Sequence, residues 1–327
     1  MDNQLRLLTQ FEQYLKENPL DGYPLSLYEP ANYIMSLGGK RLRPVFVMLI
    51  CEAFGKPATE ALKAAMAIEV FHNFSLVHDD LMDEADLRRN KPTVHKKYGV
   101  NTAILSGDVM MIQAYQHLLS YNDPILIKRL MDVMNAMAFR VCEGQQMDME
   151  FERRTDVTIS EYIDMITRKT SVLLGAASQM GAIIADADAK NQKHIYEFAK
   201  YFGICFQLQD DYLDVFGDVA QVGKRIGGDI LQNKKTYLFL KSLEQGSQDQ
   251  KNLLEKLYFT SDYNYSEEEK ITAVTQIFRD LHVSVYSREI IDAYRDLAFS
   301  HLKACDLTDE IKSYLQDLVN HWIQRVN

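Results

Sequence analysis

Residues that break helices are scarce in this sequence. Glycine occurs 15 times and proline 7 times among 327 residues, whereas average usage of the two together would be about 12% of a chain. The alternation of apolar and polar residues that is typical of strands is weak throughout. Hydrophobic residues make up 47% of the chain, which is enough for a sizeable buried core. The composition therefore favours an all-α fold.

Features of several other protein classes are also missing. No long, uninterrupted apolar run is present, so we expect no membrane span. The amphipathic start MDNQLRLLTQFEQYLKENP lacks the apolar core of a signal peptide, and the net charge of −10 argues against binding to nucleic acid. No CxxC spacing occurs, which favours free thiols in a cytoplasmic protein over disulfides or a zinc site. The cysteines are Cys51, Cys142, Cys205 and Cys305.

Helical periodicity covers most of the chain. The first helix carries Leu5, Leu8 and Phe11 on one stripe, and Thr158 with Glu161 forms a capping-box pattern at the start of a later one. We expect a loop at 216–229, where glycines gather. Further helices are predicted at 28–37, 43–55, 58–83, 101–121, 124–152, 158–184, 190–216, 234–245, 249–259, 266–279, 284–304 and 308–325. Without any linker, this pattern predicts one domain over residues 1–327, a large bundle of antiparallel helices.

Acidic residues gather where the first long helix is about to end, in SLVHDDLMDEADLRRNKP. Asp79, Asp80 and Asp83 form a DDxxD motif, in which the first and last carboxylates share one helix face. A helix C-terminus carries partial negative charge, so acids there cost stability unless a cation offsets them. Oxygen ligands suit Mg²⁺ or Mn²⁺ rather than zinc, and Mg²⁺ usually completes its shell with substrate phosphates. The motif therefore predicts a hard-cation site.

The same motif recurs at the end of another long apolar helix. QLQDDYLDVFGD contains Asp210, Asp211 and Asp214 and stands just before the glycine-rich loop. Two solvated helix ends are the alternative interpretation, but two copies at the electrostatically unfavourable end of a helix favour a site.

Basic residues accompany both motifs. Together they indicate two anionic groups, one held through metal ions and the other directly by Lys and Arg. The loop GDVAQVGKRIGGD is not a nucleotide-binding P-loop, because Arg225 follows its lysine where Ser or Thr is needed. The basic residues are Lys40, Arg41, Arg43, Arg88, Arg89, Lys169, Lys224 and Lys234.

These segments together resemble the trans-polyprenyl diphosphate synthase family over nearly the whole chain. The resemblance rests on GGKRLRP, HNFSLVHDDLMD, LRRNKPTVH, the KT pair at 169–170, FQLQDDYLD and GKRIGGD with NKKT, in the family's order. It implies the all-α isoprenoid synthase fold, a helix bundle around a central cavity walled by the two aspartate helices, and a homodimer. It also implies a prenyltransferase that joins isopentenyl diphosphate to an allylic diphosphate, either dimethylallyl, geranyl or farnesyl.

The resemblance further assigns a role to each motif residue. Asp79, Asp83 and Asp210 are implied as ligands of three Mg²⁺ ions, with Mn²⁺ possible, and the other motif acids, Asp80, Asp211 and Asp214, as partial or indirect ligands. Contacts to the allylic diphosphate or its reacting centre are implied for Arg88, Lys169, Thr170, Gln207, Lys224 and Lys234. A metal-free pocket for isopentenyl diphosphate is implied for Lys40, Arg43, His72 and Arg89.

Product length is predicted from residues on the first aspartate helix. Phe74, five residues before Asp79, is expected to form the floor for the growing chain, with Ser75 leaving room beside it. Phe71 is either a second obstruction or plain core. In the resembling family this arrangement, without an insertion between the aspartates, is typical of geranylgeranyl (C20) synthases, with farnesyl (C15) as the nearer competitor.

The chain departs from the family pattern after the glycine-rich loop. Asn233 stands where the family usually has glycine, and Leu238 where proline is common, while Lys234 and Thr236 are retained. We expect altered loop stability rather than lost activity.

Two other functions share this fold. A class I terpene cyclase carries one DDxxD motif but a different acidic triad on the other helix, and it lacks the GGKRLRP pocket. A non-catalytic regulatory subunit of a prenyl synthase typically loses one motif, whereas both are intact here.

Overall fold

The computed structural model describes residues 2–217, 226–260 and 265–323. Those residues are mostly helical, and their extended structure is limited to one short antiparallel ribbon. The fold divides into two compact units. The N-unit comprises Met1–Ala138 and Leu173–Tyr196, and the C-unit comprises Phe139–Val172 and Glu197–Asn327. The all-α prediction is confirmed, whereas a single domain over the whole chain stays a prediction.

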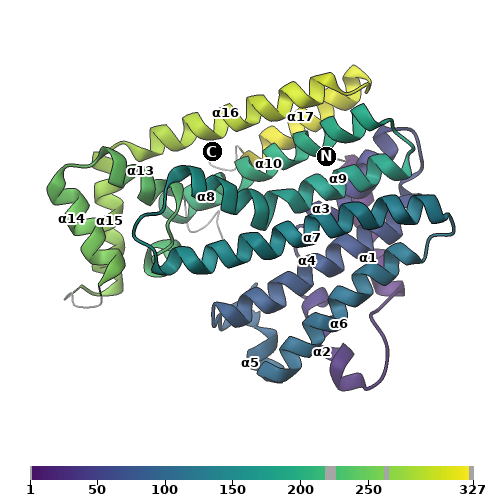
Figure 1. Ribbon diagram of the computed structural model, residues 1–327, viewed down its shortest axis with the longest axis horizontal. Helices are drawn as coiled ribbons and strands as arrows, with labels where there is room; N and C mark the ends of the chain where they lie inside the picture. Colours follow the sequence, from purple (N-terminus) through teal and green to yellow (C-terminus); the bar gives the residue numbers. More distant parts are fainter. Residues whose placement is uncertain (1, 218–225, 261–264, 324–327) are drawn as a thin grey trace. The chain divides into compact units, whose positions relative to one another are not determined.

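Figure 1 colours the elements in chain order, from purple at the N-terminus to yellow at the C-terminus. The N-unit contains α1 (Asp2–Glu17), α2 (Leu25–Ser36), α3 (Leu42–Ala53), η1 (Ala58–Ala61), α4 (Leu62–Met82), β1 (Leu87–Arg88), β2 (Lys91–Pro92), α5 (Val94–Tyr98), α6 (Val100–Leu119) and nearly all of α9 (Val172–Ile184). Two long helices, α7 (Pro124–Arg153) and α10 (Ala189–Phe216), contribute residues to both units. The C-unit contains α8 (Ile159–Ile166), η2 (Thr167–Ser171), α12 (Gly228–Leu231), α13 (Tyr237–Gln245), α14 (Gln248–Phe259), α15 (Glu267–Asp280), α16 (Val283–Ala304) and α17 (Asp309–Ile323).

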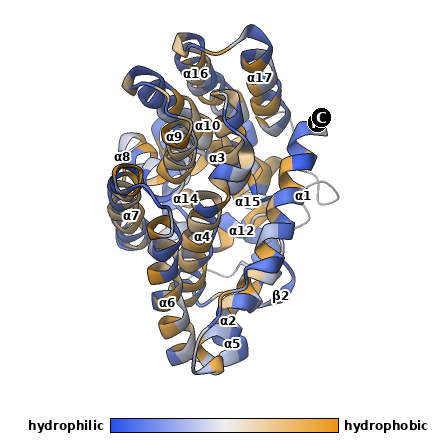
Figure 2. Ribbon diagram, turned by 90° about the vertical axis from the view of Figure 1, so that its right-hand side faces the viewer, coloured by the Kyte–Doolittle hydropathy of each residue, from blue (hydrophilic) through white to orange (hydrophobic). Residues whose placement is uncertain are grey.

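Helix α4 is the centre of the N-unit. It packs against α3 and α6, and a continuous run of its residues from Ala64 to Phe71 is buried. Gly107 lets α6 approach closely, because an added Cβ would lie 2.2 Å from Nε2 of His78 on α4. By contrast, α1 alternates between hydrophobic and hydrophilic colours in Figure 2, as expected of a helix with one buried stripe. The helix that carries the first DDxxD motif is therefore held rigidly by its neighbours.

The C-unit is built from helices with well-defined starts. Thr158 and Glu161 form the predicted capping box at α8, and equivalent boxes begin α14 and α15. Each satisfies backbone N–H groups that the helix itself leaves unpaired.

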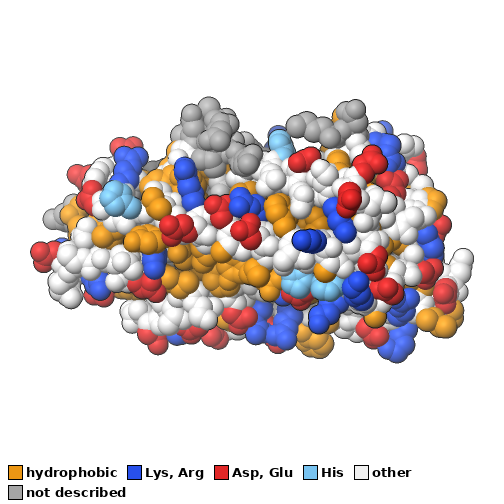
Figure 3. Space-filling view, turned by 90° about the horizontal axis from the view of Figure 1, so that it is seen from above, with side chains coloured by type: hydrophobic (Ala, Val, Ile, Leu, Met, Phe, Trp, Pro, Cys, Tyr) orange, Lys and Arg blue, Asp and Glu red, His pale blue; other side chains and the backbone are white. Residues whose placement is uncertain are grey.

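On the face shown in Figure 3, acidic and basic side chains are mixed, with apolar side chains gathered between them. Among the described residues, none of the helices combines the length and the apolarity needed to span a bilayer.

The structure differs from the predicted elements mainly in short segments. The predicted helix 58–83 begins as a 3-10 turn before α4. The predicted helix 158–184 is interrupted by a π-helical turn at Thr167–Ser171. The ribbon β1–β2, in which Arg88 pairs with Lys91, and the short helices α5 and α12 were not predicted. Helix α12 begins at the end of the predicted loop 216–229, of which residues 218–225 lie outside the described residues. All are segments too short for hydrophobic periodicity to register.

Candidate active site

The first DDxxD motif closes helix α4, and its three acids have different surroundings. Asp80 is only 2% exposed and accepts two hydrogen bonds of 2.7 Å from Nε and Nη2 of Arg88. Asp83 is exposed at the C-cap, and its N–H donates to the carbonyl of Asp79 at 2.9 Å. Asp79 and Asp83 thus lie one turn apart at the helix end. Burial raises the pKa of Asp80, although the Arg88 pair opposes that shift.

The segment GGKRLRP meets Arg89 through its two glycines. Gly38 and Gly39 have φ values of 77° and 132°, and the guanidinium of Arg89 donates to the Gly38 carbonyl. A Cβ on Gly39 would lie 2.7 Å from Nη2 of Arg89. These glycines therefore make room for a cation. Lys40, which follows them, is exposed.

Arg41 has a structural role that the sequence did not reveal. It adopts a left-handed conformation with φ of 44°, is 4% exposed, and contacts two carboxylates. Its Nε lies 2.8 Å from Glu12, and its Nη1 lies 2.5 Å from the buried Glu69. A buried charge needs such partners to be tolerated. Because its guanidinium is bound by Glu12 and Glu69, Arg41 anchors the loop that carries Lys40 at the start of α3.

Arg43 and His72 form a buried pair beside this loop. Nη1 of Arg43 lies 3.2 Å from Nε2 of His72. Burial, together with the charges of Arg43 and Arg89, lowers the pKa of His72 well below its usual value, and burial also lowers the pKa of Arg43. Within the described residues, Nε of Arg43 and Nδ1 of His72 have no hydrogen-bond partner. Guanidinium groups around a neutral imidazole, with spare polar atoms, suit an anionic ligand.

The residues predicted to limit product length pack together on α4. Phe71 is fully buried and Phe74 is 8% exposed, with ring centroids 5.3 Å apart. Phe74 also contacts the ring of His78, at 5.0 Å between centroids. Ser75 bonds back to the carbonyl of His72 at 2.8 Å. The Phe74 ring is therefore fixed by neighbours on its own helix.

The second DDxxD motif closes helix α10, within the C-unit. Its middle acid, Asp211, is buried and accepts hydrogen bonds from the hydroxyl of Tyr162 and, at 2.9 Å, from Nε2 of Gln207. The Oε1 atom of Gln207 in turn accepts from Thr170 at 3.3 Å. Burial, and then the charge of Asp229, raise the pKa of Asp211 to about 8. Asp211 thus mirrors Asp80, since both middle acids bind protein groups.

The π-helical turn η2 presents Lys169 and Thr170. One extra residue in a helical turn displaces the side chains that follow, and such turns are frequent at functional sites. Gly144 on α7 accommodates this turn, because a Cβ there would lie 2.3 Å from the backbone nitrogen of Lys169. The Lys169 ammonium lies 2.6 Å from Asp148, one turn further along α7. Helix α7 therefore positions Lys169 twice, through its backbone and through its side chain.

Residues that follow α10 in the sequence form hydrogen bonds with Asp214 of the second motif. The carboxylate of Asp214 accepts from the Asp229 N–H at 2.9 Å, and its carbonyl accepts from Gly227 at 2.6 Å. The side chain of Asp229 lies 3.3 Å from Nζ of Lys234. Although burial alone would lower the pKa of Lys234, the charges of Asp229, Asp148 and Asp211 raise it, so that this lysine stays charged.

The predicted site residues therefore form two groups. The N-unit holds Lys40, Phe71, His72, Arg43, Phe74, Ser75, Asp79, Asp80, Asp83, Arg88 and Arg89, and the C-unit holds Lys169, Thr170, Gln207, Asp210, Asp211, Asp214 and Lys234. Lys224 lies outside the described residues. In the described part of the chain, no three His, Cys, Asp or Glu side chains converge closely enough to hold a metal ion by themselves. Asp148, Tyr162 and Asp229 were missed, because each is recognised only by its contacts.

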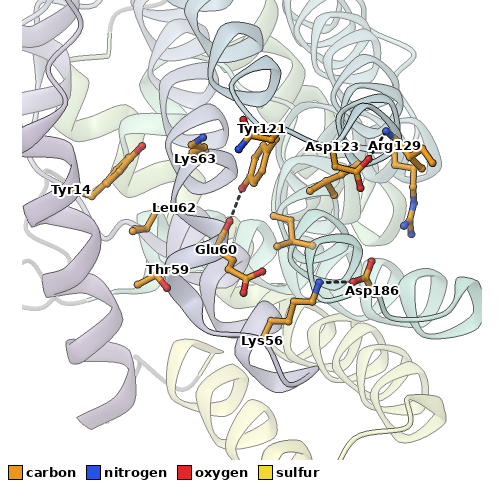
Figure 4. Close-up of a pocket in the computed structure, with 14 residues that line it drawn as sticks. Tyr14, Lys56, Thr59, Glu60, Leu62, Lys63, Tyr121, Asp123, Arg129 and Asp186 are labelled. Carbon is orange, nitrogen blue, oxygen red and sulfur yellow. Dashed lines mark hydrogen bonds and ion pairs between the residues drawn. The ribbon is translucent and has the colours of Figure 1, made fainter.

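A separate cavity of about 460 Å³ opens in the N-unit at the start of α4. Lys56 pairs with Asp186 at its edge, and the hydroxyl of Tyr121 donates to the carbonyl of Glu60 at 2.8 Å (Figure 4). Lys63 donates to the Ser120 carbonyl at 2.6 Å. None of the residues predicted to bind diphosphate lines this cavity.

An all-α fold with two DDxxD helix ends and clusters of Lys and Arg agrees with the family resemblance of the sequence. Comparison with known families tests that resemblance. The model of the polyprenyl synthetase family matches residues 24–278. The chain therefore belongs to the polyprenyl synthetase family.

Individual relatives match over most of their length. The chain is 38% identical over 318 residues to a geranylgeranyl pyrophosphate synthase of Geoglobus acetivorans, covering 97% of this chain and 95% of that protein. It is 41% identical over 233 residues to a geranylgeranyl diphosphate synthase of Sulfolobus acidocaldarius, covering 70% and 71%. A crystal structure of a geranylgeranyl pyrophosphate synthase superposes with a TM-score of 0.94 at 44% identity, covering 100% of both chains. The predicted isoprenoid synthase fold is confirmed.

Proposed function

We propose that this protein is a short-chain trans-prenyltransferase that condenses isopentenyl diphosphate with an allylic diphosphate, and that its product is geranylgeranyl diphosphate (C20). The observation that carries the proposal is the match to a geranylgeranyl pyrophosphate synthase along 97% of the chain, with both DDxxD motifs retained. A terpene cyclase or a regulatory subunit would be expected to lack one of these motifs.

The carboxylates at both helix ends fit Mg²⁺, with Mn²⁺ as the alternative. All motif donors are oxygens, and the described residues contain no site in which protein groups alone surround a metal. Mg²⁺ commonly takes one or two carboxylates and completes its shell with phosphate oxygens and water. Asp79, Asp83 and Asp210 would hold the ions, three in number as the family resemblance implies. When bound, Mg²⁺ stabilises negative charge on the leaving diphosphate.

The remaining motif acids support these ligands. Asp80 and Asp211 are engaged by Arg88 and Tyr162, and Asp214 holds the Asp229 N–H. Each contact orients a motif or the loop beside it. We assign Asp80, Asp211 and Asp214 to this supporting role, with at most partial contact to the ions.

The basic residues divide between the two substrates. Lys169, Lys234 and Arg88, with Lys224, bind the allylic diphosphate and stabilise the charge that builds up as its C–O bond breaks. The double bond of isopentenyl diphosphate then attacks the allylic carbocation, and a proton passes to the released diphosphate. Oxygens of Thr170 and Gln207 stabilise the cation during this step.

The isopentenyl diphosphate pocket is formed in the N-unit. Arg43, His72 and Arg89 offer guanidinium and imidazole groups whose surroundings suit an anion, and exposed Lys40 adds a further charge. These basic groups can bind a diphosphate directly, and the family resemblance implies that this substrate binds without metal.

The C20 product length is assigned to Phe74. Its ring is fixed against Phe71 and His78 one to two turns before Asp79, so it limits the space for a chain growing along α4. Ser75, which bonds to its own helix, leaves room beside it. Farnesyl diphosphate (C15) is the competing product.

A homodimer is proposed from the outer face of α6. Leu105, Ile112 and Leu119 recur every seven residues and are 57%, 63% and 55% exposed. Exposed apolar rows of this kind usually bury themselves against a partner, and a second copy presents the same row. A cytoplasmic location is proposed because all four cysteines are free thiols.

Isosteric replacement of the metal ligands tests the function. Asp79→Asn and Asp210→Asn should each lower turnover at least about a hundredfold, because each removes a charge that holds the leaving group. EDTA should abolish turnover by the wild type, and excess Mg²⁺ should restore it. Asp132→Asn, which changes an exposed acid on α7, is the matched control. Near-normal rates for both motif variants with unchanged circular dichroism would rule the function out.

A further inference from the structure

Two lysines are buried beside the segment that carries Lys234. Lys270 on α15 is 3% exposed and Lys235 is 4% exposed. Lys235 donates to the carbonyl of Glu152 at 2.9 Å, which joins the segment to the end of α7. Lys270 donates to Oδ1 of Asn233 and lies 5.5 Å from the centroid of the Tyr258 ring. Burial of an ammonium group is costly, so the contact between Lys270 and Asn233 calls for a role.

Asn233 has a backbone conformation that residues other than glycine rarely adopt. Its φ is 56°, a left-handed conformation that favours glycine and that Asn tolerates better than other residues. Its N–H bonds to the carbonyl of Ile230 at 3.2 Å, and the N–H of Lys234 bonds to Asp229 at 3.0 Å. This turn ends α12 and sets the direction in which Lys234 leaves it. Asn233 therefore combines the conformation of glycine with an amide that can be anchored.

Helix α15 holds the other end of the same segment. A Cβ on Gly227 would lie 2.8 Å from Cγ1 of Ile271, so the two residues are in close contact. Lys270 and Ile271 are neighbours on α15, one turn after its capping box at Ser266. Lys270 and Ile271 of α15 thus contact Asn233 and Gly227, which lie on either side of α12 in the sequence. Between these contacts lies Asp229, the carboxylate 3.3 Å from Lys234.

We propose that Lys270 and Asn233 form a positioning pair for the allylic diphosphate subsite. By holding the turn at Asn233 from α15, the pair fixes Lys234 and Asp229 in the arrangement that receives the diphosphate. Lys270 does not touch the substrate. The proposal rests on the proposed function, because Lys234 is assigned there to the allylic diphosphate. The asparagine that departs from the family's glycine is, in this chain, part of the site's support.

Three variants separate the parts of this pair. Asn233→Gly keeps the left-handed conformation but removes the amide oxygen. Lys270→Met removes the ammonium while keeping the length of the side chain. Asn233→Asp keeps an acceptor for Lys270 and tolerates the same φ. Gln232→Ala, at the exposed neighbouring position, is the control.

Steady-state kinetics with farnesyl diphosphate and isopentenyl diphosphate provide the main measurement. Asn233→Gly and Lys270→Met should each raise the KM for the allylic substrate about tenfold and leave that for isopentenyl diphosphate within about twofold. The double variant should be no worse than either single variant, because coupled residues lose their effect together. Asn233→Asp should stay close to wild type. Additive effects, or equal changes in both KM values, would show a merely structural role and overturn the proposal.

Calorimetric titration with inorganic pyrophosphate and Mg²⁺ gives a second readout that does not depend on turnover. Asn233→Gly and Lys270→Met should weaken pyrophosphate binding about tenfold in variants that retain the wild-type thermal unfolding midpoint or lie within a few degrees of it. Unchanged pyrophosphate affinity in both variants would contradict the positioning role. A wild-type protein that binds pyrophosphate but transfers no prenyl group would refute the proposed function alone.

Discussion

At the scale of single residues, the site is defined by which charges are already satisfied. The guanidinium of Arg41 forms ion pairs with Glu12 and Glu69, and the carboxylate of Asp80 forms one with Arg88. Neither group is therefore free to bind a ligand. His72 is different, because burial and the charges of the surrounding guanidiniums disfavour a proton on its ring. We therefore expect the protonation of His72 to affect the pH dependence of the free energy of unfolding.

Stability should fall in mild acid because of His72. Its pKa in the folded protein lies below that of an unfolded chain, about 6.5. Below that pH the unfolded state binds a proton that the folded state does not, so the free energy of unfolding decreases as pH falls, by up to about 1.4 kcal/mol per pH unit. His72→Gln should flatten this dependence between pH 6.5 and 5 in urea unfolding without substrates, whereas His321→Gln, at an exposed position, should not. Parallel curves for wild type and His72→Gln would contradict the assignment.

At the scale of elements, most helices could be predicted and a few functional details could not. The bounds of α7 and α10 agree with the sequence periodicity to within a residue, because their long apolar stripes continue past the single internal glycine in each. The π-helical turn could not be predicted, since TRKTS contains no helix breaker. It is set by tertiary contacts, including Gly144 on α7 and Gly203, whose added Cβ would lie 2.8 Å from Cα of Ser171.

Gly144→Ala should therefore lower activity by displacing the π-helical turn η2, without removing any group that binds substrate or metal. The new methyl group would lie 2.3 Å from the Lys169 backbone nitrogen, so η2 or α7 must shift and Lys169 must move with it. We expect a loss of stability of about 1–3 kcal/mol and a loss of turnover of at least about tenfold, measured by thermal unfolding and by prenyl transfer. Asn135→Ala, at an exposed site on the same helix, should have neither effect. Wild-type turnover in Gly144→Ala would show that the π-helical turn is not needed.

At the scale of the whole molecule, the sequence predicts which residues act but gives no sign of the residues that support them. The DDxxD motifs are local patterns, so spacing alone is enough to propose their carboxylates as ligands. The partners of Lys169 and Arg41, by contrast, come from residues 21 and 28 positions away, and no periodicity links them. The same limit applies to Lys270, which lies 37 residues from Asn233 and shows no sequence pattern of its own.

Assembly is the second property at this scale. If the exposed row on α6 joins two copies, a charge at its centre should separate them, because burying an unpaired carboxylate costs several kcal/mol. Ile112→Glu should elute as a monomer in size-exclusion chromatography with light scattering, whereas wild type should have twice the mass of one chain. Val285→Glu, which alters an exposed apolar residue on α16, should remain a dimer. A dimeric Ile112→Glu variant would place the interface elsewhere.

The most direct measurement is the chain length of the product. The purified protein should be incubated with Mg²⁺, isopentenyl diphosphate and, in separate reactions, dimethylallyl, geranyl or farnesyl diphosphate. The products are then dephosphorylated and separated by chromatography. We predict that every accepted starter is extended to C20 and no further. Failure to extend any starter, or conversion of a starter to a cyclic hydrocarbon, would contradict the assignment as a prenyltransferase, and a product that stops at C15 would contradict the role of Phe74.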